Sequence, residues 1–322
     1  SGISITDSGM ATRNLGVQLT ANGASGTSSS NALLLRSNAS VDVGGSVGVN
    51  VAKSTGGGLG AAAIYMTVGT LNAAQNNGGS RTFIRGGSVN VNMALSGTNA
   101  WGLFGEHATG VEATNGNLSI TATYSGAGST SGTGVFIGSG WNGFYAPAAS
   151  YLKATNGGIT VQSITAGTSA DGGLVLSGTA VSATNDINLK AQLTDSTKTA
   201  INISSEWNSN PKINSFAGNL LFQSNKGAIR IASLTAGALT GTDIIIDNTG
   251  SALTRDASSS NYVKGAGGFT GATGASIGIA GSGTGIQATG SLDIIGVGSV
   301  AGSSGVTLTT TGLSGGRVSV QG

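Results

Sequence analysis

Ionisable side chains that could form a catalytic site are few in this 322-residue chain, which contains 12 Asp and Glu residues, one His and no Cys. Asp243 and Asp247 flank three isoleucines. In an extended strand they would lie on one face, about 13 Å apart. The carboxyl groups of a glycosidase pair are closer, at ~5 to 9.5 Å, so we interpret both as solubilising charges at strand ends. Glu106 precedes His107, but adjacency alone is weak support for an acid–base pair, because a lone His usually has a structural role.

The sequence also lacks the patterns that accompany bound metals and cofactors. It has no Gly-Gly-x-Gly-x-Asp repeat of the calcium-binding kind, and the glycine-rich residues 265–274 neither follow a clear strand nor open a helix, as a phosphate loop would. The absence of Cys rules out disulfides and Cys-bound zinc. We therefore expect no cofactor, no metal site and no enzymatic activity.

Aromatic residues offer a different chemistry, namely binding. Residues 97–107, 136–151 and 204–214 contain all three Trp residues, both Pro residues and the single His. Their rings stand beside Gly, Asn and Ser and not inside apolar triplets, so we predict loops that project from the body of the protein. Exposed rings beside amides suit the apolar faces and hydroxyl edges of sugars. The candidate receptor-binding residues are Trp101, Phe104, Trp141, Asn142, Phe144, Tyr145, Trp207 and Asn208. Alternatively, these rings fold back and only cover the body.

Composition indicates a folded, all-β chain. Gly accounts for 58 residues and charged residues for only 8%, against ~25% in ordinary domains. An apolar fraction of 38% and a net charge of +2 exclude intrinsic disorder. Only two Pro residues and no three-residue Gly period exclude collagen, and no window has sustained helical spacing of apolar residues.

Charge and hydropathy also bear on partners. The 14 Lys and Arg residues are spread thinly along the chain, which argues against a nucleic-acid partner. No stretch of 18 apolar residues is present, so we expect no membrane span.

An internal repeat suggests how the strands are arranged. Four segments, which have Val111, Leu152, Val181 and Ile286 as their first apolar residue, each read apolar, polar, Ala-Thr or Ala-Thr-Asn, turn, then an apolar-polar-apolar triplet. Another apolar pair follows that first residue after 20 to 24 positions. Such a period favours a right-handed parallel β-helix, a single unit over residues 1–322, over a sandwich. With ~4.8 Å per strand, 14 or 15 coils would form a rod about 70 Å long.

The same repeat makes two further predictions. Asn115, Asn156 and Asn185 recur at one turn, where their amides can form a ladder between coils. Trp101, Trp141 and Trp207 are separated by 40 and 66 positions, nearly two and three such coils. The three rings would then emerge at a similar angular position.

The Ala-Thr-Asn-Gly-Asn-Leu-Ser-Ile coil at residues 113–120, followed by Gly-Thr-Gly-Val-Phe-Ile at 132–137, resembles the passengers of two-partner secretion, the filamentous-haemagglutinin-like exoproteins. Among them the chain is most similar to the high-molecular-weight non-pilus adhesins, well over Val111 to Gly322 and more loosely before that. The resemblance implies a secreted rod on a Gram-negative surface that binds host-cell glycans or other receptors. It also implies an outer-membrane transporter as partner of the full-length protein.

The Asn-Pro motifs of that family's amino-terminal secretion domain are absent, since Pro follows Asn only at Asn210-Pro211. Both ends of the chain also read as strands without a polar cap. These features suggest an internal fragment of a longer exoprotein.

We therefore expect a non-enzymatic, receptor-binding segment of a surface adhesin. One alternative is a structural stalk of a large exoprotein, such as a contact-dependent inhibition filament, without its own receptor site. A second alternative is a polysaccharide-degrading enzyme, because many β-helices have that activity.

Overall fold

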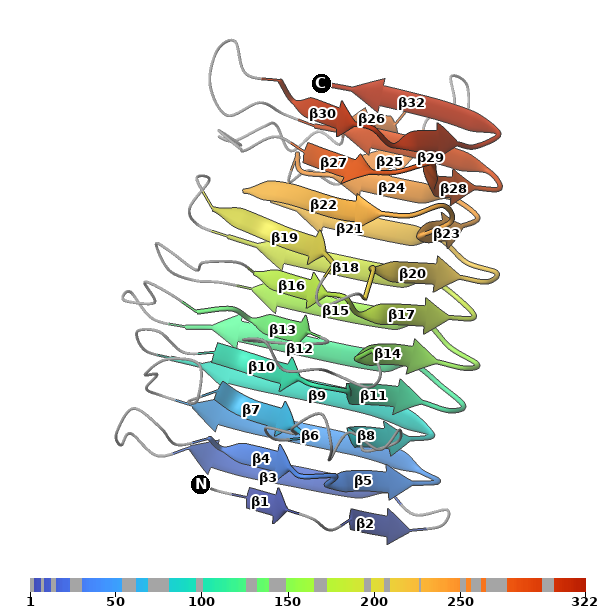
Figure 1. Ribbon diagram of the computed structural model, residues 1–322. Helices are drawn as coiled ribbons and strands as arrows, with labels where there is room; N and C mark the ends of the chain where they lie inside the picture. The colour runs from blue at the N-terminus through green and yellow to red at the C-terminus, as the bar shows by residue number, and fades with distance from the viewer. Residues whose placement is uncertain are drawn as a thin grey trace.

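The computed structural model describes residues 3–6, 9–12, 16–23, 31–53, 62–68, 81–96, 101–125, 132–138, 149–164, 173–193, 198–205, 209–225, 227–249, 253–255, 262–264, 277–296 and 304–322. Across these residues all regular elements are β-strands, and no helix occurs. Thirty strands form three parallel sheets of ten strands each, stacked as in Figure 1. The predicted parallel β-helix is confirmed.

Each coil contributes one strand to each of three sheets, which we call A, B and C. Sheet A contains β1 (Ile3–Thr6), β4 (Leu33–Arg36), β7 (Ala62–Thr67), β10 (Trp101–Glu106), β13 (Val135–Gly138), β16 (Leu174–Ser177), β19 (Thr199–Ser204), β22 (Ala228–Leu234), β27 (Ile277–Gly281) and β30 (Val306–Thr309). Sheet B contains β2 (Gly9–Thr12), β5 (Ser40–Val43), β8 (Thr82–Gly86), β11 (Thr109–Ala113), β14 (Tyr151–Ala154), β17 (Ala180–Ala183), β20 (Lys212–Ser215), β23 (Leu239–Gly241), β28 (Thr284–Ala288) and β31 (Gly312–Ser314).

Sheet C closes each coil with β3 (Val17–Gly23), β6 (Ser46–Lys53), β9 (Ser88–Leu95), β12 (Leu118–Tyr124), β15 (Ile159–Ile164), β18 (Ile187–Gln192), β21 (Leu220–Ser224), β24 (Ile244–Asp247), β29 (Ser291–Ile295) and β32 (Arg317–Gln321). In Figure 1 sheets A and B run left to right, sheet C returns behind them, and the chain rises from its N-terminus, which makes the coil right-handed. A separate antiparallel hairpin joins β25 (Leu253–Arg255) and β26 (Tyr262–Lys264).

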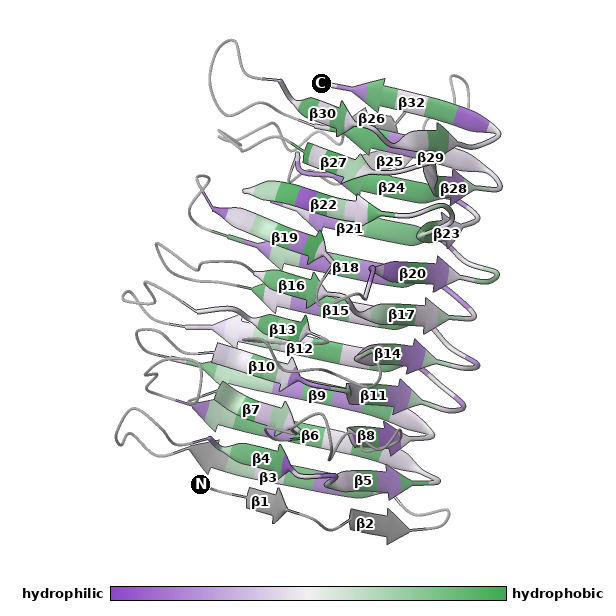
Figure 2. Ribbon diagram, in the orientation of Figure 1, coloured by the Kyte–Doolittle hydropathy of each residue, from purple (hydrophilic) through white to green (hydrophobic). Residues whose placement is uncertain are grey.

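Alternation along the strands builds a narrow apolar core. In β12 the buried residues Leu118 and Ile120 enclose the partly exposed Ser119, and Figure 2 shows the same mixture of hydrophobic and hydrophilic positions in most coils. Parallel register stacks equivalent side chains, because Ile120 pairs with Val91 of β9 and Val161 of β15. The core is therefore a set of continuous columns that run along the axis.

The four repeated segments are equivalent, as predicted, but the predicted coil length is wrong. Val111, Leu152 and Val181 are direct partners in sheet B. Successive positions in this column lie 41 (111 to 152) and 29 (152 to 181) residues apart, and the shortest step is 26 (213 to 239). The distances of 20 to 24 ran from sheet B of one coil to sheet A of the next, for example from Val111 to Val135, and so omitted part of the coil.

The predicted number of coils is also too high. Ten coils are present, and nine steps of ~4.8 Å give a stack about 43 Å long. Segments that read as irregular contribute strands to these coils. Residues 59–85 include β7 and most of β8, and residues 97–107 include β10. The irregular stretch 249–273 includes the hairpin of β25 and β26.

Side-chain acceptors reinforce the corner between sheets B and C. Asn156 Nδ2 donates to Asn115 Oδ1 at 3.3 Å, which confirms that pair of the predicted ladder. A second ladder lies at the residue before sheet C: Asp186 accepts from the backbone N–H of Asn219, Asn219 from that of Asp243, and Asp243 from that of Ser291, at 2.7 to 3.0 Å. Each polar side chain thus satisfies a backbone donor of the next coil.

Asp247, interpreted from sequence as a solubilising charge, is fully buried. Its carboxylate accepts hydrogen bonds from the Thr249 N–H at 2.8 Å and from Gln223 Nε2 at 3.2 Å. Burial raises the pKa of Asp247 above that of an exposed Asp, and these hydrogen bonds oppose the rise. The strand-end interpretation is therefore wrong for Asp247.

The raised pKa of Asp247 predicts a pH-dependent stability. Because the folded state disfavours the ionised form, the stability contribution of this carboxyl group is complete below the unfolded-state pKa and is lost as pH rises through the folded-state pKa. We expect Asp247→Asn to melt about 2 °C or more above the wild type at pH 7 and to gain less at pH 4. Circular dichroism melts at both pH values measure this, and a gain that is equal at both would contradict it.

Candidate functional site

The structure places two of the eight predicted receptor-binding residues, Trp101 and Phe104, on strand β10. They do not lie on a projecting loop, so that part of the prediction is wrong. Trp141, Asn142, Phe144, Tyr145, Trp207 and Asn208 lie outside the described residues.

The predicted convergence of the three tryptophans at one angular position is not supported. Trp101 begins a strand of sheet A in the fourth coil. Trp141 belongs to the connection from β13 to β14, and Trp207 to the connection from β19 to β20, which lead from sheet A to sheet B in the fifth and seventh coils. The separations of 40 and 66 residues therefore correspond to one and two coils, because real coils are longer than the predicted 20 to 24 residues.

Trp101 and Phe104 belong to an aromatic cluster on the outer face of sheet A. Alternation turns Leu103 into the core and Phe104 to the outside. Parallel register places Phe104 between Tyr65 of β7 and Phe136 of β13. The ring centroids of Phe104 and Phe136 lie 4.8 Å apart in a stacked arrangement, and those of Phe104 and Tyr65 lie 5.6 Å apart. We call Tyr65, Trp101, Phe104 and Phe136 the sheet A aromatic cluster.

The members of this cluster differ in accessibility. Phe104 is only 2% exposed and Phe136 7%, so neither ring offers a face to a receptor. Trp101 is partly exposed. Its ring stands nearly perpendicular to Phe104, with centroids 5.3 Å apart, and also contacts Phe136 at 6.3 Å. Trp101 is therefore an accessible aromatic side chain on a rigid aromatic base.

A buried polar group adjoins the cluster. Tyr65 donates a hydrogen bond from its hydroxyl to Glu106 Oε1, and Oε2 of the same carboxylate lies 3.7 Å from His107 Nε2. Burial raises the pKa of Tyr65, as does its bond to Glu106, and burial lowers the pKa of His107. His107 is therefore neutral at pH 7 and Tyr65 keeps its proton.

His107 also has a structural role at the corner between sheets A and B. It follows β10 with φ of +58°, as Ser37 follows β4 with +56° and Gly178 follows β16 with +58°. A left-handed residue lets the chain turn sharply between the two strands. Glu106 and His107, adjacent in sequence, are thus in contact but enclosed, and this arrangement favours a structural interpretation over an acid–base pair.

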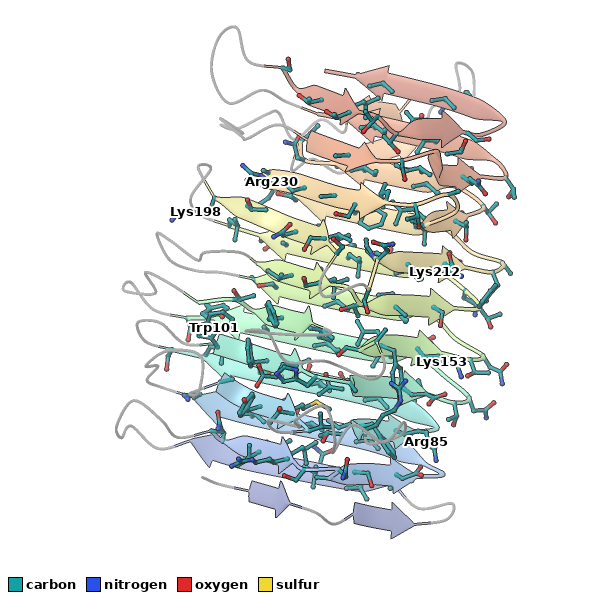
Figure 3. The ribbon with its side chains drawn as sticks, viewed as in Figure 1. Arg85, Trp101, Lys153, Lys198, Lys212 and Arg230 are labelled. Atoms are coloured by element: carbon teal, nitrogen blue, oxygen red, sulfur yellow. The ribbon has the colours of Figure 1, made fainter. Side chains whose placement is uncertain are left out.

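Sheet B carries a column of alternating charges. Register places Asp42, Arg85, Glu112 and Lys153 above one another. Arg85 forms two hydrogen bonds to Asp42, one of them from Nε to Oδ1 at 2.9 Å, and Lys153 Nζ lies 3.0 Å from Glu112 Oε1. Figure 3 shows Arg85 and Lys153 at the opposite side of the view from Trp101. Because these charges neutralise one another, the column offers no strong field to a charged ligand.

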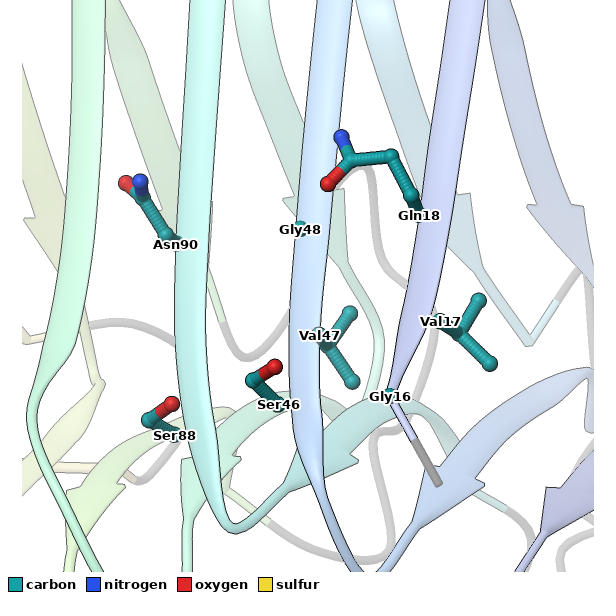
Figure 4. Close-up of a pocket in the computed structure, with 8 residues that line it drawn as sticks. All are labelled: Gly16, Val17, Gln18, Ser46, Val47, Gly48, Ser88 and Asn90. Atoms are coloured by element: carbon teal, nitrogen blue, oxygen red, sulfur yellow. The ribbon is translucent and has the colours of Figure 1, made fainter.

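A polar hollow lies on the outer face of sheet C near the N-terminal coils. It has a volume of about 370 Å³ and is lined by side chains that include Gln18, Ser46, Ser88 and Asn90. Figure 4 shows Gln18 and Asn90 on either side of Gly48. A Cβ at Gly48 would lie 2.1 Å from Gln18 Oε1, so the missing side chain makes room for the amide. The hollow has amides and hydroxyls but no aromatic ring.

Tyr65, Phe136 and Phe216 are potentially functional aromatic residues that the candidate list omits. Strand register, which requires knowledge of the coil length, would have been needed to align Tyr65 and Phe136 with Phe104. Phe216 lies just after β20 and is 75% exposed. Its signal in the sequence is a large apolar residue between Ser215 and Ala217 at a turn.

Two searches of the described part of the chain concern metals and membranes. Within it, no group of three or more His, Asp or Glu side chains is placed to hold a metal ion. The same residues include no helix with the length and hydropathy needed to cross a membrane.

Comparisons with known proteins add no relative from which a role could be carried over. No protein-family model matches the chain, and it matches no curated protein and no solved structure.

Proposed function

We propose that this chain is a receptor-binding segment of a secreted bacterial adhesin of the two-partner-secretion type. It would act at a Gram-negative cell surface and attach the cell to host glycans or another surface receptor. An outer-membrane transporter would be the partner of the full-length protein. The parallel β-helix and the resemblance of residues 113–120 and 132–137 support this proposal.

The observation that carries the proposal is the setting of Trp101. A partly exposed indole is held from two sides by the buried rings of Phe104 and Phe136. Such a support reduces the conformational entropy that a binding side chain would otherwise lose. An accessible aromatic surface suits the apolar face of a sugar ring or an apolar group of a protein receptor. Binding at Trp101 requires no bond-making step, only an aromatic surface that is already in place.

A structural stalk is the second candidate, and the hydrogen-bonding pattern favours it. Acceptor ladders at Asp186, Asn219 and Asp243, together with the mutually neutralised charges of sheet B, stabilise a rod without the need for a ligand. An enzymatic function remains the third candidate, with Glu106 and His107 as its only adjacent acid–base pair in the described chain.

Replacing Trp101 separates the adhesin from the stalk. We expect Trp101→Ala to weaken attachment of the purified chain to epithelial cells about tenfold or more, because truncation of a central binding aromatic often costs ~2 kcal/mol. Trp101→Phe keeps an aromatic ring and should retain most of the attachment. Flow cytometry with the labelled chain measures this.

The thermal transition of each variant is the control for folding. Trp101→Ala should still melt in one transition, with a shift much smaller than that of a buried aromatic. Normal attachment by a folded Trp101→Ala variant would contradict a receptor site at Trp101.

A further inference from the structure

Phe216 occupies a corner position that the fold does not require to be aromatic. It directly follows the last residue of β20, at the corner between sheets B and C, and is 75% exposed. Register shows that the equivalent residue in five other coils is threonine: Thr114, Thr155, Thr184, Thr242 and Thr289. The fold is thus compatible with a small polar residue at this corner.

Backbone hydrogen bonding does not distinguish Phe216 from these threonines. The Phe216 N–H donates to the Ala183 carbonyl at 2.9 Å, and the Thr184 N–H donates to the Ala154 carbonyl of its preceding coil at 3.2 Å. Thr155 donates equivalently to Ala113 at 2.9 Å. The ring of Phe216 therefore adds apolar surface in contact with water without a backbone reason, and exposed aromatic surface of this kind is typical of binding sites.

The ring adjoins a hollow that crosses the next three coils. The hollow has a volume of about 570 Å³ and extends from Phe216 over β23 and β28 to Ser314 of β31. These strands are neighbours on sheet B at the right of Figure 1. Three steps of ~4.8 Å make the hollow about 14 Å long, the length of a short oligosaccharide.

The side chains around the hollow define the class of ligand. Besides Phe216, its larger side chains are those of Thr240, Thr242, Gln287, Thr289 and Ser314, all uncharged hydroxyls or amides. No Lys, Arg, Asp or Glu lines it, so nothing in it would select an anion or a cation. Thr242, Gln287, Thr289 and Ser314 are exposed and able to exchange hydrogen bonds with a ligand.

We infer that Phe216 and this hollow bind a short, neutral oligosaccharide. One pyranose ring stacks its apolar C–H face on the phenyl ring, and the following sugar units lie along the hollow with their hydroxyls toward the Thr, Ser and Gln side chains. A neutral sugar combines these features because each unit carries an apolar face and a hydroxyl edge. The inference rests on the proposed glycan-binding function and places a second site, far from Trp101, on another side of the rod.

The test uses the whole purified chain and four hexaoses as probes, namely maltohexaose, cellohexaose, chitohexaose and lacto-N-neohexaose. Saturation-transfer difference NMR and calorimetry identify the bound sugar and its Kd. We expect at least one hexaose to bind, Phe216→Thr to weaken it tenfold or more, and Phe216→Trp to preserve it. Phe216→Thr is a matched variant because it installs the residue found in the other coils, so its thermal transition should be unchanged.

Two further variants and one further measurement make the outcomes distinct. Gln287→Ala should weaken the same sugar by a smaller factor, and Trp101→Ala should leave its Kd unchanged. Absence of binding by all four sugars, or equal binding by Phe216→Thr, would overturn the inference. So would a change in sedimentation coefficient on Phe216→Thr, because the ring would then join two copies of the chain.

Failure of this site and failure of the proposed function give different results. If sugars ignore Phe216 but cell attachment still depends on Trp101, only the second site is lost. If a hexaose binds at Phe216 while the chain attaches to no cell, the sugar site stands and the adhesin proposal is lost.

Discussion

We expect Ile120→Asp to abolish the cooperative thermal transition, or to destabilise the fold by several kcal/mol. Ile120 is fully buried in β12 and stacks between Val91 and Val161. A carboxylate there would have no partner among the apolar side chains of this column, and a buried unpaired charge is costly. Because each coil is stabilised by its neighbours, the damage should extend to β9 and β15.

Ser119→Asp is the matched control for that substitution. Ser119 precedes Ile120 in the same strand but is partly exposed, and its partners are the polar residues Asn90 and Thr160. We expect a change within about 0.5 to 1 kcal/mol. Circular dichroism melts and hydrogen exchange across residues 88–95 and 159–164 measure both effects. Equal melting of the two variants would contradict the assignment of inward and outward faces.

The second large effect is expected at Phe104. Its ring is 2% exposed and lies between Tyr65 and Phe136, so Phe104→Ala would leave a cavity within the sheet A aromatic cluster. We expect a loss of ~3 to 5 kcal/mol in the free energy of unfolding, as for other buried Phe to Ala changes. Denaturant titration measures it.

Phe104→Leu restores much of the missing volume and should recover more than half of that loss. A loss below ~1 kcal/mol for Phe104→Ala, together with weaker cell attachment, would show that the ring acts at the surface. The original prediction of Phe104 as a receptor-binding residue would then be correct.

The general architecture could be predicted because a β-helix repeats local rules. Val111, Leu152 and Val181 share a sequence pattern, and parallel register makes them partners. Coil length could not be obtained the same way. Similarity was visible at sheets B and C, while connections of variable length separate them from the next strand of sheet A, so steps within one sheet vary, for example 41 and 29 residues.

The strand at Trp101 was missed because glycines disguise it. Gly102 and Gly105 give residues 101–106 the appearance of a loop. In the fold, a Cβ at Gly102 would lie 2.1 Å from the carbonyl oxygen of Gly134, and one at Gly105 would lie 2.8 Å from Thr109 Oγ1. The two glycines are therefore required by close packing between neighbouring segments and do not mark a turn. Sequence alone does not distinguish these two uses of glycine.

The proposed adhesin function is tested most directly by attachment of the chain itself to cells. Inert particles coated with the purified chain would be applied to epithelial cells, beside albumin-coated particles and particles coated with Trp101→Ala. We predict attachment well above the albumin level, a reduction for Trp101→Ala, and no release of reducing ends from the cell-surface glycans. Attachment no greater than that of albumin-coated particles would contradict a receptor-binding segment and favour the stalk.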